Sequence, residues 1–193
     1  MKKMSFSKKQ QGLNLIELLL VLAIVVAIAV AAFIIYPRVQ AGRQATSNSQ
    51  ILSGALAQIQ SIYQNGQYAT LTSIVAAKSN VFPDSFVVDA VAGTLVNEFA
   101  PDATANVTVS GSLADATANA TNAARFVTIT YGDVPSAVCI KLVPGLAANF
   151  GRIAVGGTVV LDKFAATPVD FDEAAMVTAC TTADTADLTL TAR

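Results

Sequence analysis

The first long pattern in the sequence is a run of apolar side chains that no polar residue interrupts. It extends from Leu18 to Tyr36, and Glu17 stands directly before it. About 20 apolar residues in a helix cross the hydrocarbon core of a membrane, so the run is nearly long enough to do so. A lone carboxylate is costly at such a position and requires a partner or a purpose. The pattern predicts a membrane-spanning helix whose start carries an unexplained acid.

A second helical pattern follows the apolar run. Its apolar positions are spaced by four, three and four residues: Leu52, Leu56, Ile59 and Tyr63. The opposite side is polar, so the spacing predicts an amphipathic helix that ends at Asn65-Gly66, where Gly66 suits a left-handed cap. Pro37 and Gly42 permit a bend or a locally melted stretch between the two helical segments.

The remainder of the chain is predicted to be rich in short strands. Alternating or β-branched segments favour strands, and they fall at residues 86–91, 106–109, 125–131, 153–155, 158–161 and 188–190. A short helix is expected at 71–78. A second is expected to begin at a capping box with Asp170 as the cap and to run through Cys180. Segment 135–143 fits either a helix or a strand. Together these elements predict an α+β fold in which a long amino-terminal helix packs on an antiparallel sheet.

Turn-forming residues set the expected ends of these elements. Gly156-Gly157 predicts the turn of a hairpin. Gly132-Asp133 is expected to end the strand before it, and Pro144-Gly145 is expected to stop a helix over 135–143. The polar stretch 114–124 is low in complexity and predicts an exposed loop.

Charge is distributed unevenly along the chain. The first nine residues contain four lysines and no acid: Lys2, Lys3, Lys8 and Lys9. Without them the chain has eight basic side chains against thirteen acidic ones, a net charge of −5. The basic end is expected to stay in the cytoplasm, which puts the acidic body on the other side of the membrane. An acidic body without a Lys/Arg stripe is not expected to bind nucleic acid.

Candidate catalytic chemistry is sparse. The sequence has no His, which excludes a Ser-His or Cys-His pair. The nearest approach to a charged site is a group of residues in one region of the sequence: Asp162, Lys163, Asp170, Asp172 and Glu173. A solvated face and a helix cap account for them, so the chain is not expected to be an enzyme or to bind a cofactor.

The two cysteines, Cys139 and Cys180, are 41 positions apart. There is no C-x-x-C pair and no His, so a metal site is not expected. Behind a membrane-crossing segment, two cysteines favour one disulfide formed outside the cytoplasm. Two buried free thiols are the alternative.

Three interpretations account for the amino-terminal region. A secretory signal has an apolar core of about 7–15 residues and then a cleavage site, and this core is longer. A plain membrane anchor has the right length but gives Glu17 no role. The third rests on the residues before the run. Lys8-Lys9-Gln10-Gln11-Gly12, followed by Leu13-Asn14-Leu15-Ile16-Glu17, resembles the processing site of type IV prepilins.

The resemblance implies that a prepilin peptidase cuts on the cytoplasmic side, between Gly12 and Leu13, and that the apolar helix is kept. Leu13 then carries the new, N-methylated amine, and Glu17 becomes the fifth residue of the mature chain. An amine and a carboxylate that meet between neighbouring subunits offset part of each other's desolvation. Glu17 is therefore expected to be an assembly residue.

Within this family the chain is most similar to the type IVb group, which includes bundle-forming and plasmid thin-pilus pilins. The first mature residue is Leu rather than Phe, the mature length is 181 residues, and the Cys139–Cys180 interval is wide. The stretch VPSAVC that ends at Cys139 also resembles the corresponding region of those pilins. The resemblance implies four parts: a leader at 1–12, an apolar assembly helix at 13–36, its amphipathic half at 37–65 and an extracytoplasmic domain at 66–193 that includes the disulfide-bounded region 139–180.

The resemblance implies a structural role as the major subunit of a pilus. Copies of the chain would wait in the inner membrane, and an assembly machine there would extract them into a helical filament on a Gram-negative type of surface. Adhesion, aggregation and conjugative contact are the expected roles. A minor pilin is an alternative, as is a secretion-system pseudopilin, for which Asp184 and Asp187 would be candidate calcium ligands. A membrane-anchored binding domain that never polymerises is the alternative from another class.

Overall fold

The computed structural model describes residues 15–101, 105–112 and 125–193. The chain divides into two compact units, Met1–Gln40 and Ala41–Arg193. The first helix, α1, spans Leu15–Ile62 and is helical throughout, with Pro37 inside it. Neither Pro37 nor Gly42 interrupts the helix, although the sequence permits a melted stretch there. The predicted loop at 114–124 lies outside the described residues.

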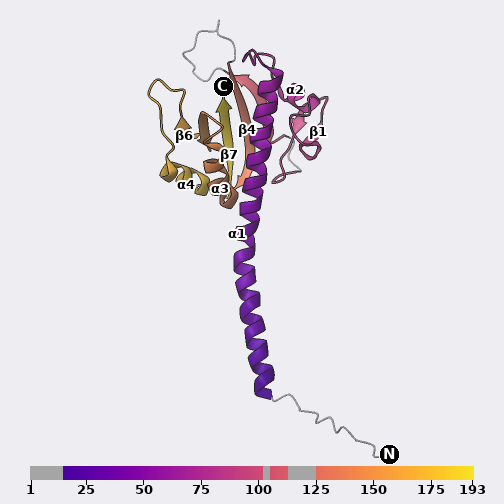
Figure 1. Ribbon diagram of the computed structural model, residues 1–193, viewed down its shortest axis with the longest axis vertical. Coiled ribbons are helices and arrows are strands. Elements are labelled where there is room, and N and C mark those ends of the chain that lie inside the picture. The colour runs from indigo at the N-terminus through magenta and orange to yellow at the C-terminus, as the bar shows by residue number, and fades with distance from the viewer. Residues whose placement is uncertain (1–14, 102–104, 113–124) are drawn as a thin grey trace, which may run out of the picture. The chain divides into compact units, whose positions relative to one another are not determined.

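The second unit is built on one antiparallel sheet (Figure 1) with the strand order β1-β2-β3-β4-β7-β5-β6. The strands are β1 (Val87–Asp89), β2 (Thr94–Leu95), β3 (Val107–Ser112), β4 (Phe126–Pro135), β5 (Arg152–Val155), β6 (Thr158–Asp162) and β7 (Thr185–Ala192). The short helices are α2 (Ser73–Lys78), a 3₁₀ turn at Asp84–Phe86, α3 (Ser136–Leu146) and α4 (Glu173–Thr181). The predicted α+β fold, with a long helix on an antiparallel sheet, is confirmed.

The carboxy-terminal half of α1 crosses the sheet in Figure 1 and buries one stripe of side chains. The buried positions recur every three or four residues, as one helical face requires: Ala41, Ala45, Asn48, Leu52, Ala55, Leu56 and Ile59. They join a core with the inward residues of the central strands, such as Ile129 on β4 and Leu190 on β7. The amphipathic pattern is confirmed, although the helix ends at Ile62 rather than at residue 65.

One polar group lies inside this stripe and is satisfied by hydrogen bonds. Asn48 is 1% exposed, and its Oδ1 accepts a hydrogen bond from the hydroxyl of Tyr131 on β4. Its Nδ2 donates to the Gln44 carbonyl at 2.8 Å and to Glu98 Oε1 at 2.6 Å. Burial, reinforced by the nearby Glu98 carboxylate, raises the pKa of Tyr131 well above its ordinary value, so the phenol stays a donor. The network joins α1 to the sheet at one defined register.

Two predicted element ends are wrong because tertiary contacts extend the elements. β4 does not end at Gly132-Asp133 but continues to Pro135 across a bulge between Tyr131 and Val134. Asp133 takes a left-handed φ of 57°, and its N–H donates to Asp187 Oδ1 at 3.1 Å, so the bulge leaves this donor satisfied. Of segment 135–143, Pro135 ends β4 and residues 136–143 are helical, and α3 continues past Pro144 to the fully buried Leu146.

The start of α4 is a third correction. The cap is Asp172, whose Oδ1 accepts a hydrogen bond from the Ala175 N–H at 2.9 Å, and not Asp170. The predicted hairpin at Gly156-Gly157 is confirmed, since both glycines have the positive φ that a tight hairpin turn requires. β2 was not predicted, because two residues are too few to carry a period.

Two glycines of the body are expected to respond oppositely to an added methyl group. A Cβ at Gly111 would lie 1.8 Å from the Tyr68 carbonyl oxygen, whereas a Cβ at Gly54, on the exposed face of α1, would meet nothing within 4 Å. We expect Gly111→Ala to lower the free energy of unfolding by about 1–3 kcal/mol. Gly54→Ala should raise it by about 0.5–1 kcal/mol through helix propensity. Denaturant unfolding of the detergent-solubilised chain measures both, and an unaltered midpoint for Gly111→Ala would contradict the close approach.

Candidate assembly site

The amino-terminal half of α1 is uncovered by the rest of the described chain. Every residue from 15 to 39 is exposed, including bulky aliphatic and aromatic side chains such as Phe33 at 80%. By length and composition, α1 is long and apolar enough to cross a membrane. A water-exposed protein surface rarely carries a continuous apolar patch larger than a few hundred Å². This helix therefore needs lipid, or the apolar surfaces of other molecules, around it.

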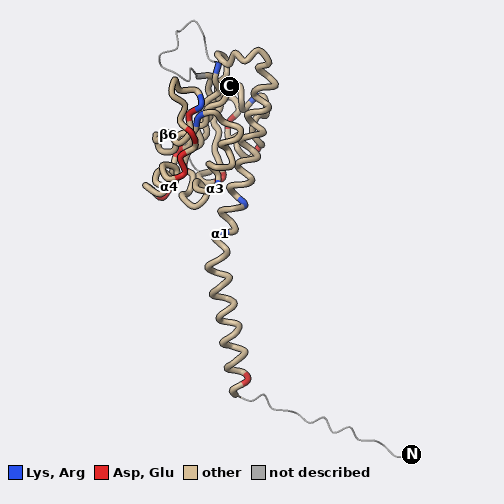
Figure 2. The backbone as a smooth tube through the Cα atoms, turned by 60° about the vertical axis from the view of Figure 1, so that its left-hand side comes forward, with Lys and Arg blue, Asp and Glu red and all other residues tan. Residues whose placement is uncertain are grey.

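Charge is absent from the middle of this segment. In Figure 2 most of the backbone coloured for charged residues belongs to the body, and the sequence has no charged residue between Glu17 and Arg38. Glu17 lies in the first turn of α1 and is exposed. The unpaired N–H groups at a helix start favour a carboxylate there, but only by about 0.3–1 kcal/mol. That gain does not offset the cost of a carboxylate in hydrocarbon, which leaves Glu17 in need of a cation.

No ion pair joins Glu17 to another described residue, whereas Arg152 and Asp162 in the body form a salt bridge. The predicted partner, the amine of Leu13 after a cut at Gly12, lies outside the described residues. The processing site and the assembly role of Glu17 thus remain predictions from the sequence.

A hollow on the apolar helix was not foreseen from the sequence. It has a volume of about 330 Å³ and is lined by Ala29, Ala32, Phe33 and Tyr36, which are spaced by three, one and three positions and so share one face. Small side chains beside a large exposed ring allow another apolar helix to approach closely. The spacing of these four residues in the sequence is the signal that could have predicted the hollow.

The disulfide predicted from the two cysteines is present. Cys139 on α3 and Cys180 on α4 are bonded, with their Cα atoms 5.8 Å apart, and both are fully buried. Met176 Sδ lies 3.9 Å from Cys180 Sγ in the same pocket of the core. The bond fastens two helices that the sequence separates by a hairpin, and it removes the free-thiol alternative.

Two of the charged residues near 162–173, Asp162 and Asp172, have structural roles. Asp162 is nearly buried, pairs with Arg152 Nε at 3.2 Å, and accepts hydrogen bonds from the Phe164 and Ala165 N–H groups. It thereby shapes the loop after β6, while Asp172 caps α4. Among the described residues, no group of three or more His, Cys, Asp or Glu side chains could hold a metal ion.

Comparisons with known proteins agree with this architecture. Residues 42–193 match the family model described as PilS N terminal. The fold is similar to the crystal structure of TcpA, a type IV pilin from Vibrio cholerae El Tor biotype, with a TM-score of 0.51 and 18% identity. That similarity covers 78% of this chain and 99% of the TcpA chain, and at this identity it establishes the fold alone. No curated protein matches the sequence.

Removing the disulfide is expected to destabilise the body by a predictable amount. The bond closes a loop with a sequence separation of 41 residues. Loop-closure entropy for that length corresponds to about 3–4 kcal/mol. We expect the double variant Cys139→Ala/Cys180→Ala to lose about this much unfolding free energy in denaturant titrations. Titration of the unmodified chain with a reductant present, which reduces the bond as the chain unfolds, is the control and should show an equal loss. A variant as stable as the oxidised chain would contradict the assignment.

Proposed function

This chain belongs to the PilS N-terminal family of type IVb pilins, and we propose that it is the major structural subunit of a type IVb pilus. Pilins of this family polymerise into filaments and are structural subunits. The proposed role is accordingly structural and not catalytic, and it requires no cofactor.

The observation that carries the proposal is the contrast between the two compact units. The body has its own core and its own disulfide, whereas residues 15–39 contribute nothing to that core and stay exposed. Because the core of the body forms without residues 15–39, that apolar segment can be buried only by molecules outside the chain. Membrane lipid before assembly and the helices of neighbouring copies after assembly supply such environments.

We further propose how the amino terminus is prepared for assembly. A prepilin peptidase removes the basic leader 1–12 after Gly12, and Leu13 becomes the N-methylated first residue. The mature chain then consists of the apolar assembly helix at 13–36, its amphipathic half at 37–65 and the extracytoplasmic domain at 66–193. The amine of Leu13 in one copy pairs with Glu17 of a neighbouring copy, which sets the axial register of the filament.

The location and partners follow from these steps. The unassembled chain resides in the inner membrane with its lysine-rich leader in the cytoplasm. Its proposed partners are the peptidase, the inner-membrane assembly machinery and other copies of the chain, and the filament extends from a Gram-negative type of cell surface. Adhesion, aggregation or conjugative contact would use the exposed surface of the body.

The substitution Glu17→Ala tests the assembly role. We expect the leader to be removed as before, because the cut precedes Leu13, but filament in the sheared surface fraction should fall by at least about tenfold. An amine left unpaired in an apolar environment costs several kcal/mol, which is enough for that loss. Immunoblots of the sheared fraction and of the membrane fraction measure assembly and processing separately.

Glu173→Ala is the matched control, because Glu173 is an exposed carboxylate in the first turn of another helix. It should assemble normally. Filament from Glu17→Ala in the same amount as from the unmodified chain would refute the pairing, and equal losses from both variants would show that the effect is not specific to Glu17.

A further inference from the structure

A cavity lies in the body beside the end of α1, outside every feature assigned above. Its volume is about 490 Å³, within the range of small-molecule sites. Seven residues line it, from the last residue of α1, the turn that follows it and the start of the next segment: Ile62, Tyr63, Gln64, Asn65, Gln67, Ala69 and Thr70. All of them belong to the unit Ala41–Arg193. Binding in this cavity therefore does not depend on the exposed apolar residues 15–39.

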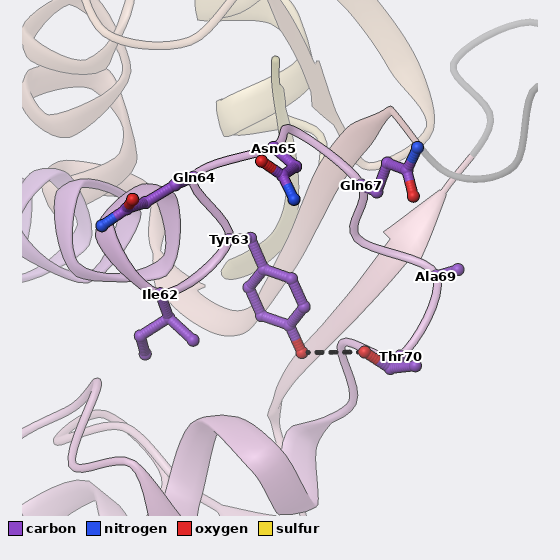
Figure 3. Close-up of a pocket in the computed structure, with 7 residues that line it drawn as sticks. All are labelled: Ile62, Tyr63, Gln64, Asn65, Gln67, Ala69 and Thr70. Atoms are coloured by element: carbon purple, nitrogen blue, oxygen red, sulfur yellow. Dashed lines mark hydrogen bonds between the residues drawn. The ribbon is translucent and has the colours of Figure 1, made fainter.

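An aromatic ring stands in the middle of the cavity and is held in place. Figure 3 shows the Tyr63 ring between Ile62 and Thr70, and the Tyr63 hydroxyl lies 3.3 Å from Thr70 Oγ1. The ring also contacts the buried ring of Tyr68, with centroids 5.6 Å apart and planes tilted by 53°. These two contacts fix the ring, so its free surface is a preformed apolar platform.

The turn that carries the lining is also fixed by its backbone. The Tyr63 N–H donates to the Ile59 carbonyl at 3.0 Å, and the Gly66 N–H donates to the Tyr63 carbonyl at 2.8 Å. Gly66 has a φ of 62°, which favours glycine. A site with a fixed ring and a fixed turn binds without the cost of ordering either.

The polar groups around the ring are neutral. Amides of Gln64, Asn65 and Gln67 and the Thr70 hydroxyl line the cavity, and no charged side chain does. Figure 3 shows Asn65 next to the Tyr63 ring, while Gln64 and Gln67 stand on either side of the ring with their amides turned outward. Each amide offers both a donor and an acceptor, which matches ligands that carry many hydroxyl groups.

We propose that this cavity binds a neutral sugar ring. One face of such a ring presents C–H groups that pack on the Tyr63 ring. The hydroxyls of the sugar exchange hydrogen bonds with the side-chain amides of Asn65, Gln64 and Gln67. An anionic ligand would find no cation in the lining, and a lipid tail would leave the amides without partners. Because the site is open and neutral, the affinity should be weak, with a Kd of about 1 mM.

Saturation-transfer NMR on the full chain tests the proposal. The chain is held in a zwitterionic detergent, because a glycoside detergent would occupy the site. The probes are galactose, glucose, mannose and N-acetylgalactosamine, with the anionic sialic acid and an acetylated, amidated triglycine as comparators. We expect transfer to the ring C–H protons of at least one neutral sugar and little transfer to either comparator.

Three variants locate the binding. Tyr63→Phe keeps the ring and should bind within about twofold of the unmodified chain, whereas Tyr63→Ala and Asn65→Ala should weaken binding by at least about fivefold. Asn149→Ala is the matched control for the loss of an exposed amide, since Asn149 donates to Ser53 Oγ at 2.7 Å elsewhere on the body. Thermal melting of each variant shows whether the body stays folded.

Transfer to no neutral sugar would overturn the proposal. So would equal transfer in folded Tyr63→Ala and unmodified chains, or stronger transfer to sialic acid or to the peptide. The result does not depend on filament assembly, so failure here would leave the proposed pilin function standing.

Discussion

The structure depends on an apolar helix that the chain does not cover. Each of its Leu, Ile, Val and Phe side chains gains about 1.5–3 kcal/mol when it leaves water. A single charge in the middle of a membrane helix costs about 2.5–3.5 kcal/mol, and Glu17 lies at the edge, where the cost is smaller. A few aliphatic residues therefore outweigh Glu17. Insertion of this helix into a membrane is therefore favourable despite the carboxylate, which is why the proposed pairing of Glu17 concerns assembly rather than insertion.

The carboxy-terminal half of α1 is held on the sheet at one defined position. One face of the helix packs into the core, and the hydrogen bonds of Asn48 to Tyr131 and Glu98 fix the helix along the sheet. A slip of α1 by one residue would leave Asn48 buried without these partners, which costs about 1–3 kcal/mol. Elsewhere in the body, the Cys139–Cys180 disulfide holds α3 to α4. The hydrogen bonds of Asn48 and the disulfide thus supplement a core of aliphatic and aromatic side chains.

The sequence predicted those features that depend on local period or on covalent chemistry. Four such features were predicted from the sequence: the apolar run, the stripe of Leu52, Leu56 and Ile59, the hairpin glycines and the paired cysteines. The sequence did not show that β4 continues through Gly132-Asp133, because the Asp187 side chain that supports the bulge is 54 residues away. It also did not show the cavity around Tyr63, because a cavity is formed by side chains whose orientations the sequence does not specify.

The most direct test of the account is the intact mass of this chain in material sheared from the cell surface. We predict the mass of residues 13–193 with one methyl group on the amino terminus and two hydrogens fewer, for the disulfide. That single value would report the cut after Gly12, the methylation of Leu13 and the oxidised Cys139–Cys180 pair in a surface structure. A chain that keeps residues 1–12 and is recovered only from the membrane would contradict the account.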